Sequence, residues 1–253
     1  MRKTVAVIGL IAAALTVPAA PALAAPDTHC TGALGAVTVD GKLVVPNGAT
    51  CTLTGTTLLA VVEVGVGSTL NATGVSIAGG ISAGQHQAVT IGGNSSIQGH
   101  VKAFRGGSVT VTDSSVFGGL ELFGNTAAVT VANVTSDNAD ITLRDNQGGV
   151  SVQNSHANGN LKVAKNSGGA TVVATTVGDG AMIEENSGGT TVNSNRVLDN
   201  ISISKNRGGA TQISNNSTDD NLDCIDNDPA PTGSGNVAGA DGNGAKSGQC
   251  AGL

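Results

Sequence analysis

The sequence predicts an all-β fold, a right-handed parallel β-helix (solenoid) of about nine coils with about 20 residues each, and two observations support this prediction. The first is a three-residue unit, apolar–x–apolar, that recurs in nine rows at spacings of 19 to 21 residues. The second is the composition, with 38 glycines, three phenylalanines and neither Trp nor Tyr. Because each glycine costs about 1 kcal/mol in a helix interior, helices are disfavoured, and a core built on large aromatic side chains is excluded.

Each row is expected to form one short strand, with its outer residues in the core and its middle residue in solvent. A second strand follows the glycines of each coil, as at 89–91 and 109–111, and a third, weaker one follows, as at 175–177. Twenty residues are too few for a strand-plus-helix unit, which needs about 30. The nine rows are Val62-Glu63-Val64, Ile81-Ser82-Ala83, Val101-Lys102-Ala103, Leu120-Glu121-Leu122, Ile141-Thr142-Leu143, Leu161-Lys162-Val163, Ala181-Met182-Ile183, Ile201-Ser202-Ile203 and Leu222-Asp223-Cys224.

The turns of successive coils share an Asn-x-Gly-Gly motif with a period of 20 residues. Stacked amides at this position are expected to hydrogen-bond along the solenoid axis; the asparagines are Asn146, Asn166, Asn186, Asn206 and Asn227. The residues that precede them alternate in charge, and we expect acids and bases of neighbouring coils to pair and to fix the register. These residues are Asp145, Lys165, Glu185, Lys205 and Asp226.

The chain is expected to divide into four segments. Residues 1–24 have a basic start, an apolar run and a small-residue cleavage site, which is typical of a signal peptide. Residues 25–61 are predicted to be an N-terminal cap with a first irregular coil, 62–227 the β-helix repeats, and 228–253 a C-terminal cap. Caps are expected because an open solenoid end would polymerise.

The four cysteines lie in two pairs, one near each end of the chain that follows residue 24. In an exported chain the expectation is two disulfides, Cys30–Cys51 and Cys224–Cys250, which would pin the caps. Zinc is the alternative, but His29 is the only histidine near any of the cysteines.

Charge and hydropathy restrict the partners and the location. Without Arg2 and Lys3 the chain has ten basic and 18 acidic residues, a net charge of −8, which disfavours nucleic acid and anionic membranes. The apolar run at the start is too short for a membrane span. We therefore expect a secreted, extracellular protein without membrane insertion.

Both ends of the chain carry a resemblance to known proteins. The run 45–56, the segments 221–224 and 228–233, and the ending 249–253 resemble small secreted repeat proteins of actinobacteria such as streptomycetes. This resemblance covers nearly all of the chain after residue 24 and implies the β-helix fold, but no particular activity. The coils are also distantly similar to bactofilins, which are polymer-forming β-helices inside the cell; polymerisation is not expected here, because the ends are capped.

Many β-helices act on polysaccharides, so an enzyme is the main alternative function. Such enzymes need paired carboxylates, or calcium with a basic residue, in a groove. One acidic cluster is a candidate calcium site, although it lacks the spacing of a known calcium loop: Asp219, Asp220, Asp223, Asp226 and Asp228. His29, His86, His100 and His156 are scattered. We therefore expect no enzyme, no catalytic residues and no cofactor.

Two non-catalytic functions remain from the sequence. The first is an extracellular structural or adhesin-like protein, with a cell-wall polymer or another surface protein as partner and with an oligomeric state that the sequence leaves open. The second is ice binding through a rank of outward hydroxyls, formed by Thr69, Thr90, Thr110, Thr130, Ser151, Thr171, Thr191 and Thr211. A second parallel rank is missing, because Thr112 is followed by Ala132 and Gln153. The structural or adhesive function is the prediction.

Overall fold

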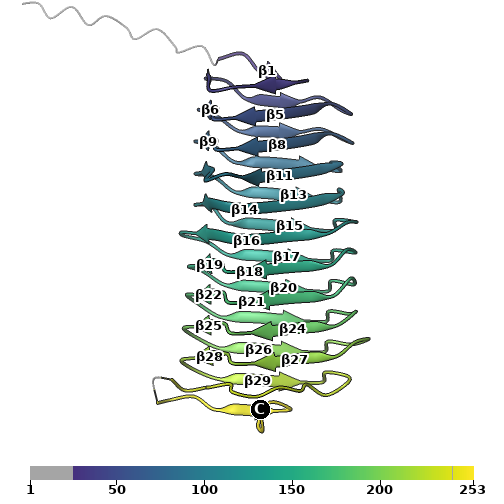
Figure 1. Ribbon diagram of the computed structural model, residues 1–253, viewed down its shortest axis with the longest axis vertical. Helices are drawn as coiled ribbons and strands as arrows, with labels where there is room; N and C mark the ends of the chain where they lie inside the picture. The colour runs from purple at the N-terminus through teal and green to yellow at the C-terminus, as the bar shows by residue number, and fades with distance from the viewer. Residues whose placement is uncertain (1–24, 241) are drawn as a thin grey trace, which may run out of the picture.

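The computed structural model describes residues 25–240 and 242–253, and the predicted signal peptide, 1–24, lies outside them. The described chain is a parallel β-solenoid of about 11 turns, which confirms the predicted fold class. Figure 1 shows the coils stacked along one axis from the N-terminus to the C-terminus. Strands in the nearer layer run to the left and strands in the farther layer to the right as the chain descends, so the solenoid is right-handed.

Each coil supplies one strand to sheet A and two segments, a longer one and a shorter one, to sheet B, and all pairings within both sheets are parallel. The twelve strands of sheet A are β1 (Thr28–His29), β4 (Leu43–Val45), β7 (Val62–Val64), β10 (Ile81–Gly84), β13 (Val101–Phe104), β15 (Leu120–Phe123), β17 (Ile141–Arg144), β20 (Leu161–Ala164), β23 (Ala181–Glu184), β26 (Ile201–Ser204), β29 (Leu222–Ile225) and β30 (Lys246–Gly248). All nine predicted rows lie in this sheet, from β7 to β29.

Sheet B holds the second and third strands of each coil. Its eighteen strands are β2 (Ala33–Leu34), β3 (Thr38–Val39), β5 (Thr50–Thr54), β6 (Thr57–Leu58), β8 (Thr69–Thr73), β9 (Ser76–Ile77), β11 (Ala88–Gly92), β12 (Ser96–Ile97), β14 (Ser108–Val116), β16 (Val129–Ser136), β18 (Val150–Gln153), β19 (His156–Ala157), β21 (Ala170–Val173), β22 (Thr176–Val177), β24 (Thr190–Asn193), β25 (Arg196–Val197), β27 (Thr211–Ser214) and β28 (Ser217–Thr218). In β14 and β16 the second and third strands are continuous.

The predicted number of about nine coils was too low. Residues 25–61, expected to be a cap with a first irregular coil, form strands β1 to β6 and continue both sheets, and β30 adds a further strand beyond the ninth row. These coils escaped the sequence pattern for a physical reason. The strand Leu43–Val45 has an apolar middle residue, and β1 and β30 carry no pair of apolar outer residues, so none of them shows the alternation of the regular rows.

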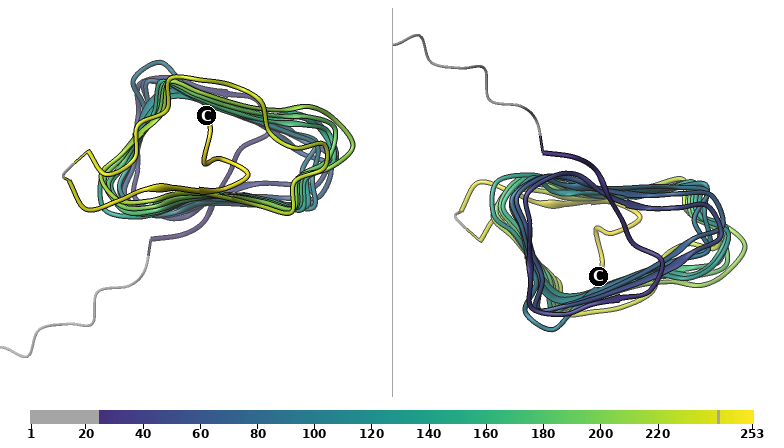
Figure 2. Two further views of the ribbon diagram at one scale, coloured as in Figure 1. Left: turned by 90° about the horizontal axis from the view of Figure 1, so that it is seen from below. Right: turned by 90° about the horizontal axis from the view of Figure 1, so that it is seen from above.

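The core is the narrow space between the two sheets. Every second residue of each strand points into this space and fills it. Seen along the axis, the coils superimpose on one flattened outline (Figure 2). The inward residues of sheet A, such as Ile141 and Leu143, and of sheet B, such as Val129 and Val131, are fully buried. Because this space is only two side chains deep, Val, Ile, Leu and Ala fill it and no aromatic ring belongs to the buried core.

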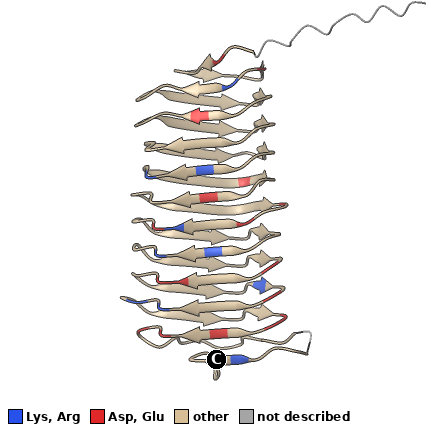
Figure 3. Ribbon diagram, turned by 180° about the vertical axis from the view of Figure 1, so that it is seen from behind, with Lys and Arg blue, Asp and Glu red and all other residues tan. Residues whose placement is uncertain are grey.

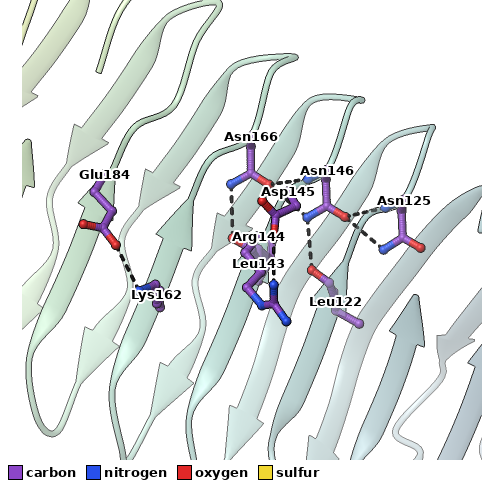
Figure 4. Close-up of polar contacts among 9 residues, drawn as sticks. All are labelled: Leu122, Asn125, Leu143, Arg144, Asp145, Asn146, Lys162, Asn166 and Glu184. Carbon is purple, nitrogen blue, oxygen red and sulfur yellow. Dashed lines mark hydrogen bonds and ion pairs between the residues drawn. The ribbon is translucent and has the colours of Figure 1, made fainter. Parts of the chain in front are cut away.

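The predicted asparagine ladder exists and is buried. Asn146 donates its Nδ2 and its backbone N–H to Oδ1 of Asn166, at 2.9 and 3.1 Å. The same Nδ2 donates to the carbonyl oxygen of Leu122 in the preceding coil at 3.0 Å, as Figure 4 shows. The pattern repeats through Asn186, Asn206 and Asn227. It therefore satisfies the buried amides of the turn and at the same time ties each coil to its neighbours.

The ladder is longer than the sequence motif. Asn125, which is not followed by a glycine pair, forms its first member and donates Nδ2 to Asn146 at 3.0 Å. At the other end, Gln249 supplies the last acceptor, since Asn227 donates to its Oε1 at 3.1 Å. The C-terminal cap thus completes the hydrogen bonding of the last coil.

A second buried ladder was missed by the sequence analysis. Asn195 donates Nδ2 to Oδ1 of Asn216 at 2.9 Å, and Asn216 donates to Asn236 at 2.9 Å. This ladder lies at the bend between the two segments of sheet B, where Thr175 also donates its N–H to Asn195 at 2.9 Å. The spacings of 21 and 20 residues were a signal that could have revealed it, but no glycine pair marks these positions.

Both ends of the solenoid are covered by the chain, and both predicted disulfides are present. Cys30–Cys51 has a Cα–Cα distance of 5.4 Å and Cys224–Cys250 one of 5.2 Å. The four sulfur atoms are bonded in pairs and are therefore not zinc ligands. Figure 2 shows the first described residues crossing one end of the coil and the C-terminal residues crossing the other. Cys250 is buried and adjoins Gln249, so the second disulfide positions the residue that ends the ladder.

The buried ladder predicts that replacing one of its asparagines destabilises the fold much more than replacing an exposed asparagine of a neighbouring turn. Asn166→Ala removes the acceptor of the buried Asn146 backbone N–H and of one of the two N–H groups of its Nδ2, so we expect a loss of about 3 kcal/mol in the free energy of unfolding. The matched control is Asn160→Ala, because Asn160 is exposed and water can replace the bonds of its side chain to Asp140 and to the Gly180 N–H; its loss should stay below about 1 kcal/mol. Chemical denaturation measures both, and equal losses would contradict the structural role of the ladder.

Candidate functional site

The two outer faces of the solenoid differ in charge. Eight of the twelve strands of sheet A carry an ionic side chain: Glu63, Lys102, Glu121, Arg144, Lys162, Glu184, Asp223 and Lys246. The eighteen strands of sheet B carry only Asp113 and Arg196. Figure 3, which views the molecule from behind, shows the coloured charges of sheet A spread along its strands. One face is therefore zwitterionic and the other is nearly neutral.

The neutral face carries a column of polar side chains along the longer strands of sheet B. Strand pairing places them side by side in successive coils: Thr52, Asn71, Thr90, Thr110, Thr130, Ser151, Thr171, Thr191 and Gln212. This column contains six of the eight residues of the predicted rank. Adjacent coils lie about 4.8 Å apart, so the hydroxyls repeat at that spacing.

Two members of the predicted rank were wrong. Thr69 faces outward as predicted, but it pairs with Ala88, and Asn71, two residues further along the same face, pairs with Thr90, because this coil has 19 residues. Thr211 pairs with Thr190 and points into the core, since the coil between them has one residue more. At Thr211 the extra residue exchanges the two sides of the strand, and the residue pattern of the sequence does not show this exchange.

The short strands of sheet B carry a second polar column, which the sequence analysis did not identify. Its members are Thr38, Thr57, Ser76, Ser96, Ser115, Thr135, His156, Thr176, Arg196 and Ser217. Within the longer strands, the expected absence of a second threonine rank holds at Thr112, which pairs with Ala132 and then Gln153. Sheet B thus presents hydroxyls along two lines that are separated by its bend.

Two shallow grooves follow sheet B. One, of about 400 Å³, lies at the bend and is lined by Asn94, Ser95, Ser96, Asp113, Ser114, Ser115, Asn133 and Thr135. The other, of about 660 Å³, runs over four coils of the Gly-Gly column beside Ser151, Thr171 and Thr191. Asp113 is the only ionic side chain in either groove, and it accepts a hydrogen bond from Nδ2 of Asn133 at 2.9 Å. The grooves therefore suit uncharged ligands with many hydrogen-bonding groups.

The phenylalanines do not offer an open aromatic face. Phe104 and Phe123 stack with their ring centroids 5.4 Å apart and their planes at 11°. The guanidinium carbon of Arg144 lies 4.6 Å from the centroid of Phe123, and Gly84 provides the space against which Phe104 leans. Because the neighbouring coils cover the ring faces, this row strengthens sheet A but is not a platform for a sugar ring.

The alternating charges that precede the asparagines do not pair as predicted. None of the ion pairs among the described residues joins two members of the column; Asp145 instead contacts Arg144, its neighbour in the chain, at 2.8 Å (Figure 4). The five residues share a left-handed backbone conformation, with φ between 54° and 57°. What these residues share is thus the backbone conformation of the turn. Ion pairs between coils form instead on the strands of sheet A, as between Lys102 and Glu121 at 3.3 Å and between Lys162 and Glu184 at 2.9 Å.

The candidate calcium residues do not converge. Among residues 25–240 and 242–253, no three acidic, histidine or cysteine side chains form a group that could hold a metal ion. Asp219 pairs with Arg196 at 3.2 Å, and Asp223 accepts a hydrogen bond from Ser247 on the neighbouring strand β30. The cluster is close in sequence, but Asp219 lies beside sheet B and Asp223 on sheet A, so the coil separates them.

The four histidines lie in different environments. His29 is on β1, His100 is exposed beside β13, and His156 on β19 is within 2.8 Å of Asn158. His86 is buried at the N-terminal side of the asparagine ladder, with Nδ1 3.2 Å from the carbonyl oxygen of Ala83. Its ring occupies the space where a side chain at Gly106 would lie. Burial lowers the pKa of His86, because the core solvates the charged imidazolium poorly.

Comparison with known proteins adds no relative: no protein family, curated protein or solved structure matches this chain. Within the described residues there is also no helix with the length and apolar character needed to span a membrane.

The buried His86 predicts a loss of stability in weak acid. Its pKa in the folded state is below the value of about 6.5 in the unfolded chain, so the unfolded state takes up a proton first as the pH falls. Stability from this residue should be constant above about pH 6.5 and should decrease below it. Urea denaturation at about pH 7 and about pH 5.5 should show this decrease in the parent, and His86→Asn should remove it. An unchanged pH dependence in the variant would show that other groups cause it.

Proposed function

We propose that this chain is a secreted, non-catalytic β-solenoid that adheres to extracellular surfaces through the outer face of sheet B. The observation behind the proposal is the difference between the two faces: sheet B carries two lines of hydroxyl and amide side chains and only two ionic residues in eighteen strands. A face with many hydrogen-bonding side chains and few charges suits contact with an uncharged, polar partner.

The chemistry of the face defines the partner. Hydroxyls that repeat at about 4.8 Å can each make one weak hydrogen bond with an extended, repetitive polymer. Many weak contacts on one rigid rod then add through multivalency. The partner that suits this face best is a neutral, hydroxyl-rich polymer such as a cell-wall polysaccharide, because the strands offer a charged polymer only Asp113 and Arg196, and Arg196 is already paired with Asp219.

Secretion is part of the proposal and has independent support. Two disulfides hold the ends, and disulfides persist mainly in oxidising compartments. The expected signal peptide at residues 1–24 is consistent with export.

The enzymatic alternative, a polysaccharide lyase or hydrolase, has less support from the described side chains. The strand carboxylates Glu63, Glu121 and Glu184 each lie within 3.3 Å of a lysine, and the C-terminal acids are separated. Ice binding would use the same threonine column, but it requires a regular flat array, and Asn71 and Ser151 interrupt the threonines while Gln212 ends them.

The proposal predicts binding that depends on sheet B. The chain from residue 25 should co-sediment with insoluble neutral polysaccharides or isolated cell wall. A Thr110→Lys/Thr130→Lys variant should lose most of this binding, about tenfold or more, because it places two charges in the centre of the neutral column. Ser202→Lys on sheet A is the matched control and should bind like the parent, since Ser202 is a partly exposed strand residue on the opposite face.

Three results would contradict the proposal. Equal binding by both variants would remove sheet B from the interaction. Release of soluble sugars from the polymers would favour the enzyme, and thermal hysteresis in freezing solutions, lost in the Thr110→Lys/Thr130→Lys variant, would favour ice binding.

A further inference from the structure

The outer face of sheet A carries an ordered column of side chains that is distinct from the adhesive face proposed above. The middle positions of β7, β10, β13, β15, β17 and β20 lie side by side in successive coils. In order they hold Glu63, Ser82, Lys102, Glu121, Thr142 and Lys162. The column therefore repeats acid, hydroxyl, base and then acid, hydroxyl, base.

This order is complementary to its own reverse. If a second copy is turned by half a revolution about an axis along the strands, between β13 and β15, its sheet A faces the first with the coil order reversed. Each column then faces itself in reverse. Glu63 meets Lys162 of the other copy, Ser82 meets Thr142, and Lys102 meets Glu121. Every acid faces a base and every hydroxyl faces a hydroxyl, over about 24 Å from the first row to the last.

We propose that two copies of this chain associate through sheet A as an antiparallel, two-fold symmetric dimer. Lys102 and Glu121 of each copy already form an ion pair at 3.3 Å. At the dyad, the two pairs would make a ring of four alternating charges. A two-fold symmetric contact requires this self-complementarity, because both copies use the same surface and every contact between two residues therefore occurs twice.

The column at the start of each strand has complementary shapes in the same arrangement. Backbone hydrogen bonds stack Val61, Gly80, His100, Gly119, Asp140 and Asn160 in successive coils. In the proposed dimer His100 faces Gly119 and Asp140 faces Gly80, so these two long side chains each meet a glycine, while Val61 faces Asn160 at the outer pair. A hollow of about 380 Å³ over Gly80, bordered by His100 and Lys102, is the place that Asp140 of the other copy would enter.

The column at the end of the strands agrees with the same axis. Phe104 faces Phe123 of the other copy, and Arg144 faces Gly84. The partly exposed edges of the stacked rings would then be covered, which buries apolar surface at the centre of the contact. Three independent columns thus select one axis, and a parallel arrangement would instead place every charge against its own kind.

The first test measures mass in solution. Light scattering on the oxidised chain from residue 25, at about 100 µM and low salt, should give a dimer. Lys102→Glu should raise the dimer Kd about tenfold or more, because it gathers four acids at the dyad. Lys102→Glu/Glu121→Lys restores both the ion pair within each copy and the complementarity, and it should dimerise like the parent. A monomeric parent, or a double variant that stays as weak as the single one, would overturn the proposal.

The second test distinguishes the orientation. All four native cysteines are in disulfides, so an introduced thiol reacts alone. A short bis-maleimide should join Ser82→Cys to Thr142→Cys only when the two variants are mixed, and neither variant should link to itself. Linkage of Ser82→Cys to itself would show a parallel dimer and overturn the antiparallel one. Thr110→Cys on sheet B is the control and should not be linked in either experiment.

Discussion

The whole structure depends on the register between successive coils, and buried amide hydrogen bonds maintain that register. A parallel stack of short strands can slip, since Val, Ile and Leu are nearly interchangeable in a narrow core. An asparagine in the ladder cannot slip, because a shift by one residue would leave its Nδ2 and its neighbour's Oδ1 buried without partners. A complete ladder adds little to the free energy of the folded state, whereas a broken one leaves buried amides without partners and is strongly unfavourable. The ladder therefore selects one alignment of the coils, and this alignment determines which side chains form columns on the outer faces.

Much of the fold could be predicted because its repeat is short and its core is simple. The nine rows and the ladder at Asn146 to Asn227 follow from spacing and alternation, and both disulfides follow from the paired cysteines of a chain expected to be exported. The terminal coils could not be found in this way, because β4 has an apolar middle residue and β1 and β30 lack a pair of apolar outer residues. The ladder member Asn125 and its terminal acceptor Gln249 lack the glycine motif, so only the path of the chain reveals them.

The outer surface was harder to predict than the core. Whether Thr211 faces solvent depends on a single extra residue in its coil, and whether Asp145 meets Lys165 depends on side-chain direction in a left-handed turn. Both are invisible to a pattern of residue types. The proposed functions use the two faces differently: if sheet A joins two copies, both sheet B faces point away from the contact, and one dimer could hold two strands of a polymer together.

The exact 20-residue interval of the Asn-x-Gly-Gly coils has a consequence for how such a chain can change. Removing or duplicating 20 consecutive residues between Asn146 and Asn206 would leave every ladder contact, inward side chain and turn in place, with only the height of the rod altered by about 4.8 Å. Recombination within this stretch therefore yields a folded product whenever the breakpoints lie one period apart. The length of the solenoid can therefore change in evolution by whole coils, while the capped ends stay the same.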